Sequence, residues 1–124
     1  MLIIFFYISG NASFPHFSIK PQNTYAIIDS NSKLPTFKCS MNYHFGELLW
    51  LKHNHSSGFL DILVENNTSR FPSKYIITGE NEISINDISL EDSGKYICSN
   101  GISNDAIQAS AELIVLGKLK ITYL

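Results

Sequence analysis

Residues 92–98 read Asp-Ser-Gly-Lys-Tyr-Ile-Cys and end on one of the two cysteines in this chain of 124 residues. The other cysteine, Cys39, lies far upstream, and Trp50, the single tryptophan, follows it closely. Around these positions the sequence alternates short runs of β-branched and aromatic residues with clusters of Asn, Ser, Gly and Asp. Runs spaced about 8–12 residues apart in this way predict an all-β sandwich or small barrel.

The expected strands follow from those runs. They cover residues 17–20, 25–28, 36–40, 48–52, 59–64, 75–78, 82–85, 94–100 and 110–116. The third strand is expected to begin after Pro35, because proline cannot donate a backbone hydrogen bond to a paired strand. No long segment shows the helical spacing of apolar residues.

The order Cys39, Trp50, Cys98, with Tyr96 two residues before the second cysteine, resembles an immunoglobulin domain. The resemblance implies an immunoglobulin-like sandwich of intermediate or variable type, in which a Cys39–Cys98 disulfide joins the two sheets. Trp50 would pack on that bridge, Tyr96 would bond to the backbone at a corner, and Gly94 would permit a tight turn. The alternative is a pair of unbridged buried thiols in a reducing compartment.

The same resemblance implies an ion pair at one end of the sandwich. Residues 69–72, Ser-Arg-Phe-Pro, resemble the start of strand D in variable-type and intermediate-type domains. In those domains this arginine pairs with the aspartate that opens the Asp-x-Gly-x-Tyr-x-Cys motif. Arg70 is the only arginine of the chain, and Asp92 opens the motif, so the resemblance implies a structural Arg70–Asp92 pair.

The first residues of the chain predict secretion. Residues 1–8 are apolar and uncharged, and small residues follow at Gly10 and Ala12, which predicts a signal peptide over residues 1–12. The alternative is a buried N-terminal strand. The domain is then expected over residues 17–117, with a tail over residues 118–124. Glycosylation sequons at Asn54, Asn66 and Asn67 fit an extracellular protein, although two adjacent asparagines are expected to carry only one glycan.

Composition excludes several classes of function. The chain is 44% apolar and 16% charged, as expected of a folded domain. A net charge of −2 argues against a nucleic-acid partner, which usually needs a basic face. No apolar run reaches the roughly 18 residues that a membrane span needs. With these classes excluded, we expect the partner to be a protein. The chain itself is expected to be a monomer or a weak dimer.

The sequence predicts no catalytic site, metal site or cofactor. Four histidines, His16, His44, His53 and His55, invite a metal-binding interpretation, but no cysteine or carboxylate completes a ligand set beside them. No nucleophile elbow and no glycine-rich phosphate loop is present. An alternative to a binding protein is a protein of a different functional class, a small hydrolase or a metal protein.

Strand alternation predicts a surface for a partner. If Trp50 and Cys98 point inward, then Leu49, Leu51 and Ile97 point outward on neighbouring strands. Ile114 points outward on the last strand by the same rule. An exposed apolar sheet face of this kind usually marks an interaction site. One alternative is that the C-terminal tail covers this face. The other is that the face is used in self-association.

A narrower resemblance involves the segment Leu49-Trp50-Leu51 together with residues 59–63, Phe-Leu-Asp-Ile-Leu. These segments resemble the secreted interleukin-18-binding proteins, including poxviral ones. The resemblance implies a soluble decoy that captures a host cytokine, with Phe59 as apolar anchor and Asp61 facing basic residues of the cytokine. The many residues with A/T-rich codons fit a viral immune-evasion protein. The alternative is an adhesion or receptor-type module that binds a cell-surface protein or itself.

Overall fold

The computed structural model describes residues 14–28, 33–42 and 48–117. The expected signal peptide, the expected tail and His44 lie outside these residues. The regular secondary structure of the described residues is almost entirely β-strand, and its one helical turn is the short 3-10 helix η1 (Leu90–Asp92). No described helix is long and apolar enough to cross a membrane.

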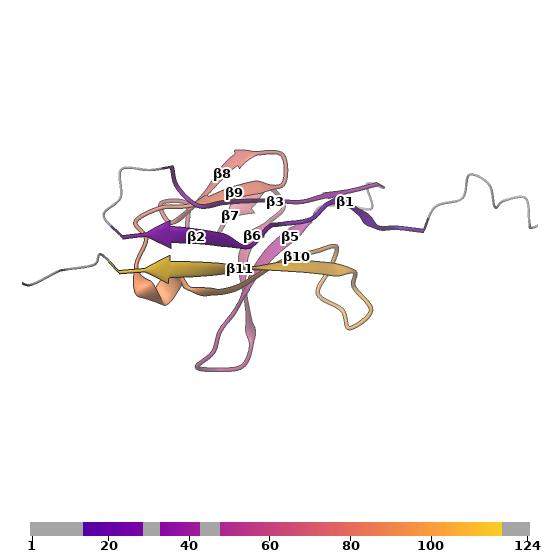
Figure 1. Cartoon of the computed structure of the whole chain (residues 1–124). Helices are drawn as coiled ribbons and strands as arrows, with labels where there is room; N and C mark the ends of the chain where they lie inside the picture. Colours follow the sequence, from indigo (N-terminus) through magenta and orange to yellow (C-terminus); the bar gives the residue numbers. More distant parts are fainter. Residues whose placement is uncertain (1–13, 29–32, 43–47, 118–124) are drawn as a thin grey trace, which may run out of the picture.

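The strands form two facing sheets and a small strand pair (Figure 1). The larger sheet has the order β2 (Thr24–Ile27), β11 (Gln108–Leu116), β10 (Gly94–Ser99), β5 (Leu49–His53), β6 (Leu60–Glu65) and β7 (Thr68–Ser69). The second sheet has the order β3 (Thr36–Lys38), β9 (Glu82–Ile85) and β8 (Tyr75–Gly79), and β1 (Phe17–Ile19) pairs with β4 (Ser40–Met41). All neighbours are antiparallel except β2 and β11, which run parallel.

A disulfide between Cys39 and Cys98 joins the two sheets and confirms the predicted bridge. Cys39 lies between β3 and β4, whereas Cys98 belongs to β10 of the larger sheet. Both cysteines and Trp50 belong to one buried apolar cluster that draws residues from both sheets. Phe37 stacks on Tyr96 in this cluster, with ring centroids 5.1 Å apart. The all-β, immunoglobulin-like sandwich predicted from the sequence is therefore confirmed.

Most expected strands are present with shifted ends, and one was missed. The predicted strand 36–40 is interrupted at Cys39, and β3 begins after Pro35, whose carbonyl accepts a hydrogen bond from Ile85 N at 3.0 Å. The additional strand is β7, which pairs with β6 across the turn formed by Asn66 and Asn67. Both asparagines have positive φ angles, 54° and 55°, which asparagine tolerates better than most residues.

The turn into β10 has the geometry that the motif at residues 92–98 predicts. The Tyr96 hydroxyl donates a hydrogen bond to the carbonyl oxygen of Asp92 at 2.7 Å. Burial, with smaller contributions from Tyr75 and Asp92, raises the pKa of Tyr96 well above its usual range, so the hydroxyl keeps the proton that it donates. Gly94 adopts a φ of 146°, a conformation that residues with a Cβ rarely adopt.

We therefore expect Gly94→Ala to lower the free energy of unfolding by about 1–2 kcal/mol, because the cost arises in the backbone. A Cβ at this position would meet only ordinary contacts, the nearest being His55 Nε2 and Lys52 Cε at 3.6 Å. Urea denaturation measures the loss. Gly101→Ala is the control, because Gly101 has no positive φ and its added Cβ would lie 3.9 Å from Ala106. Equal losses in both variants would contradict the backbone explanation.

Candidate functional site

The outer face of the larger sheet differs from the predicted apolar patch. Leu49, Leu51 and Ile97 pack together with Ile62 in a small cluster separate from the main core. Their exposed fractions are only 8%, 1% and 4%. The prediction that these three residues are exposed is wrong, because they lie on neighbouring strands and cover one another. They stabilise the sheet and are not available to a partner.

Ile114 lies elsewhere on the same sheet and remains partly exposed. It belongs to β11, where it is paired with Tyr25 of β2. The strands β10 and β5 separate β11 from β6. The structure therefore does not bring Ile114 together with Phe59 and Asp61 into one contact area.

The loop between β5 and β6 presents the most accessible aromatic side chain of the predicted site. Asn54 organises this loop: its Oδ1 accepts hydrogen bonds from the backbone N–H groups of Ser56 and Ser57, and its Nδ2 donates to Asp61 Oδ2 at 3.1 Å. Asn54 N also donates to the carbonyl of Phe59 at 2.8 Å. Phe59 is held at the end of the loop with 73% of its surface exposed.

Further exposed apolar residues lie on β6 or in the segment that follows β7. Leu60 and Phe71 are both exposed, and both line the same hollow in the surface as Asp61. We call Phe59, Leu60, Asp61 and Phe71 the β6 surface. Sequence reasoning identified Phe59 and Asp61 but missed Phe71, although Phe71 belongs to the quoted segment 69–72.

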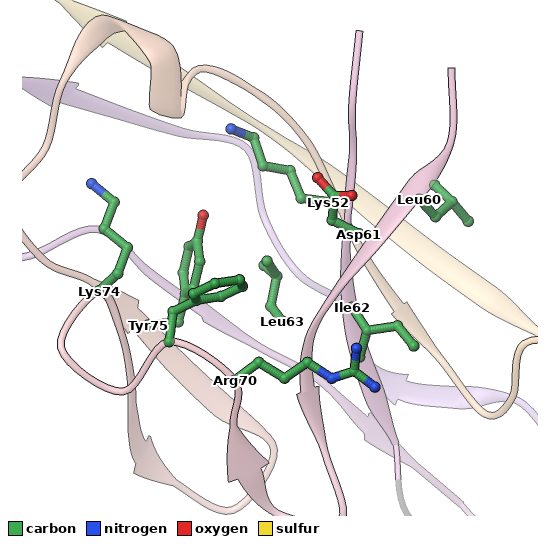
Figure 2. Close-up of a pocket in the computed structure, with 9 residues that line it drawn as sticks. Lys52, Leu60, Asp61, Ile62, Leu63, Arg70, Lys74 and Tyr75 are labelled. Atoms are coloured by element: carbon green, nitrogen blue, oxygen red, sulfur yellow. The ribbon is translucent and has the colours of Figure 1, made fainter. Parts of the chain in front are cut away.

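The hollow beside the β6 surface has a volume of about 600 Å³. Figure 2 shows Leu63 and Tyr75 near its middle, the amines of Lys52 and Lys74 on one side, and the guanidinium of Arg70 on the other. Apolar and aromatic walls with a few charged groups at the rim are typical of sites that receive a side chain from a partner.

Two of these three cations already have carboxylate partners. Lys74 Nζ lies 2.7 Å from Asp92 Oδ2, and Arg70 Nη2 lies 2.9 Å from Glu65 Oε1. The implied Arg70–Asp92 pair is therefore wrong, and Lys74 takes the place of Arg70.

The backbone explains this exchange of partners. Arg70 N donates to the carbonyl of Leu63, which keeps residue 70 beside β6 and its carboxylate Glu65. Lys74 precedes β8, and its ammonium also donates to the carbonyl of Asp87 at 2.8 Å. Asp92 is buried, and its Oδ2 additionally accepts a hydrogen bond from the N–H of Ser89 at 2.8 Å, so this oxygen has two donors without Arg70.

Lys52 is the third cation of the hollow and forms no ion pair with the described residues. Its Nζ donates to the carbonyl of Glu91 at 2.8 Å and lies 5.5 Å from the ring centre of Tyr96. Burial lowers the pKa of Lys52, while the nearby carboxylate of Asp92 opposes that shift. An ammonium with one protein acceptor retains donors for a group brought by a partner.

His53 ends β5 and His55 lies in the loop that follows, with the Asn54 sequon between them. The rings of His53 and His55 meet edge to face at 5.1 Å, and His16 Nδ1 lies 2.9 Å from the carbonyl of Phe14. The described residues contain no group of three or more potential metal ligands. Asn54 uses its side chain within the loop, whereas Asn66 and Asn67 form the turn before β7, and glycosylation at these sites stays a prediction.

The fold is similar to those of known immunoglobulin-domain proteins. The chain is similar to extracellular domains 3–5 of Drosophila OTK at 23% identity, covering 82% of this chain and 31% of that one, with a TM-score of 0.55. It is similar to Sidekick-1 immunoglobulin domains 1–5 at 21% identity, covering 84% of this chain and 20% of that one, with a TM-score of 0.62. It is also similar to a chain in the titin M10–obscurin-like 1 complex at 16% identity, covering 86% of this chain and 96% of that one, with a TM-score of 0.58.

These likenesses define the class of the domain. No family model and no curated protein matches the chain. The chain spans about a third of the OTK structure and a fifth of the Sidekick-1 structure, each of which contains several domains. At these identities the likeness shows the immunoglobulin-like fold alone.

Proposed function

We propose that the chain is an extracellular binding module that captures a protein partner on the β6 surface. The observation that carries this proposal is the exposure of Phe59, an aromatic side chain held by a hydrogen-bonded loop directly before β6, whose residues Leu60 and Asp61 line a hollow of about 600 Å³. Aromatic side chains that are exposed in the free protein and become buried against a partner supply much of the energy of many protein interfaces.

The proposed compartment rests on the disulfide and on the sequence. A Cys39–Cys98 bridge persists in an oxidising environment, as outside the cell. The apolar residues 1–8 and the three sequons support the same compartment. Edman sequencing of the protein secreted from eukaryotic cells tests the expected removal of residues 1–12.

The finer proposal is that the partner is a cytokine of the interleukin-1 and interleukin-18 group, which the module would keep from its receptor. The resemblance assigns Phe59 as anchor and Asp61 as charged contact, and the exposure of Phe59 and the position of Asp61 in the wall of the hollow support these roles. Leu49 and Leu51 are buried and would act only as support. Biolayer interferometry against an interleukin panel tests the cytokine. Absence of binding at micromolar concentration would reject it and leave a cell-surface protein as the partner.

We expect Phe59→Ala to weaken binding to the captured partner by about 2 kcal/mol, or roughly 30-fold in Kd. The loss follows from removing the anchor while leaving the loop hydrogen bonds, which involve the backbone of residue 59 and the side chain of Asn54. Titration of both proteins against the same partner measures the ratio.

Ile102→Ala is the matched control. Ile102 has the same exposed fraction as Phe59, 73%, but lies in the loop between β10 and β11. Its truncation is expected to leave the Kd within about twofold, as for most surface contacts outside a hot spot. Unchanged affinity in Phe59→Ala would move the binding site away from the β6 surface.

A further inference from the structure

Strand β2 forms the edge of the larger sheet opposite to β7. It pairs only with β11, to which it runs parallel, and Figure 1 shows the two strands side by side. None of its four residues is buried, including Thr24 and Ala26, which face the other sheet. Nothing in the described part of the chain covers the outer edge of β2.

The free backbone groups of this edge belong to two residues. Ile28 N donates to the carbonyl of Leu116, so residue 28 directs its backbone toward β11. Backbone direction alternates along a strand, and Ala26 therefore also faces β11. Tyr25 and Ile27 direct their N–H and C=O groups away from β11, where an added strand would bond to them.

The side chains beside this edge form an apolar patch. Tyr25, Ile27, Ile114 and Leu116 point to the same face of the sheet and are between 38% and 68% exposed. We call these four residues the β2 patch. Strand β2 contains no charged residue and no proline, the residues that usually protect an edge strand from pairing with another chain.

We propose that β2 pairs with β2 of a second copy of this chain, antiparallel and about a two-fold axis at Ala26. In this register Tyr25 of each copy lies opposite Ile27 of the other, and both residues with free backbone groups form hydrogen bonds. An aromatic residue opposite a β-branched one is a favourable cross-strand pair. The two β2 patches then join into one apolar band across the interface.

A second copy fits this edge better than an unrelated strand, because the same four residues supply both halves of the contact. The uncharged edge and its patch repeat across the axis, so every apolar group meets an apolar group. The β6 surface lies toward the other edge of the sheet and stays free in both copies. The dimer would therefore present two copies of that surface and gain avidity for a clustered partner.

Sedimentation velocity of the full chain over a concentration series tests the proposal. The wild type is expected to change from monomer to dimer in the micromolar range, and Ile27→Lys is expected to raise the dissociation constant by at least about tenfold. Ile102→Lys, which changes another exposed apolar residue away from β2, is expected to leave the dissociation constant unchanged. A wild type that stays monomeric up to roughly millimolar concentration, or a dimer that Ile27→Lys does not weaken, would overturn the proposal.

A charge-pair experiment tests the register. In a mixture of Tyr25→Lys and Ile27→Glu chains, one lysine lies opposite one glutamate, and the wild-type Tyr25–Ile27 pair remains on the other side of the axis. The mixture is expected to form heterodimers at least about tenfold tighter than either variant alone forms homodimers. Equal association in all three samples would overturn the register. Thermal unfolding of each variant shows whether the fold is retained, because both side chains are exposed in the monomer.

Discussion

Replacing Cys39 and Cys98 together by alanine is expected to lower the free energy of unfolding by about 4 kcal/mol. The bridge closes a loop of about 60 residues, and its main effect is to restrict the unfolded chain. A domain of this size is usually stable by only about 5–15 kcal/mol, so the variant keeps a small margin at best. Urea denaturation of wild type and variant, followed by tryptophan fluorescence from the buried Trp50, measures the difference.

The single variant Cys39→Ala provides the control for this experiment. Loss of either cysteine opens the same loop, so the single variant is expected to lose nearly as much stability as the double variant. Reduction of the wild type should give a comparable loss. A loss below about 1 kcal/mol in all three samples would contradict the assigned role of the bridge, because loop closure alone predicts several times more.

The fold was predictable because its decisive residues combine local spacing with strict geometry. Cys39, Trp50, Tyr96 and Cys98 all lie in the buried cluster that the motif implies. The two-residue strand β7 was missed, because so short a segment has no periodicity of its own. The adjacent asparagines at 66 and 67 were the available signal, since both adopt the positive φ angles of a tight hairpin turn.

The candidate site was less predictable, because alternation gives the direction of a side chain but not what covers it. Leu51 lies on the outer face and is still 1% exposed, since Ile62, Leu49 and Ile97 surround it. Pairing between β5 and β6 is shifted between Trp50 and Leu51, and that irregularity brings Ile62 opposite Leu51. Neither the shift nor the resulting cover can be derived from the order of residues in one strand.

Apart from Ile114, which was expected to point outward and is exposed, the β2 patch was missed for a related reason. The sequence predicts a strand at residues 25–28 but does not say that it pairs in parallel with the last strand. That pairing places Tyr25 beside Ile114 and Ile27 beside Leu116. The patch therefore depends on contacts between residues that are almost a whole domain apart in sequence.

The resemblance did not predict the correct ion-pair partner of Asp92. The resemblance implied an ion pair of Asp92 at this end of the sandwich, and Asp92 does form one, but the cation is Lys74. We expect Lys74→Met to lower the free energy of unfolding by about 3 kcal/mol. Methionine retains the apolar stem, so the loss comes from leaving the buried Asp92 carboxylate with only the hydrogen bonds from Ser89.

Arg70→Gln is the comparison that separates the two assignments. Arg70 and Glu65 expose 51% and 39% of their side chains, and ion pairs with this much exposure contribute about 0–1 kcal/mol. Urea denaturation of both variants should therefore show a loss in Lys74→Met several times that in Arg70→Gln. The reverse order would restore the pairing that the resemblance implies. Lys74 precedes β8, and Asp92 lies in η1 just before β10. A larger loss in Lys74→Met than in Arg70→Gln would therefore show that the Lys74–Asp92 pair stabilises the contact between these two segments.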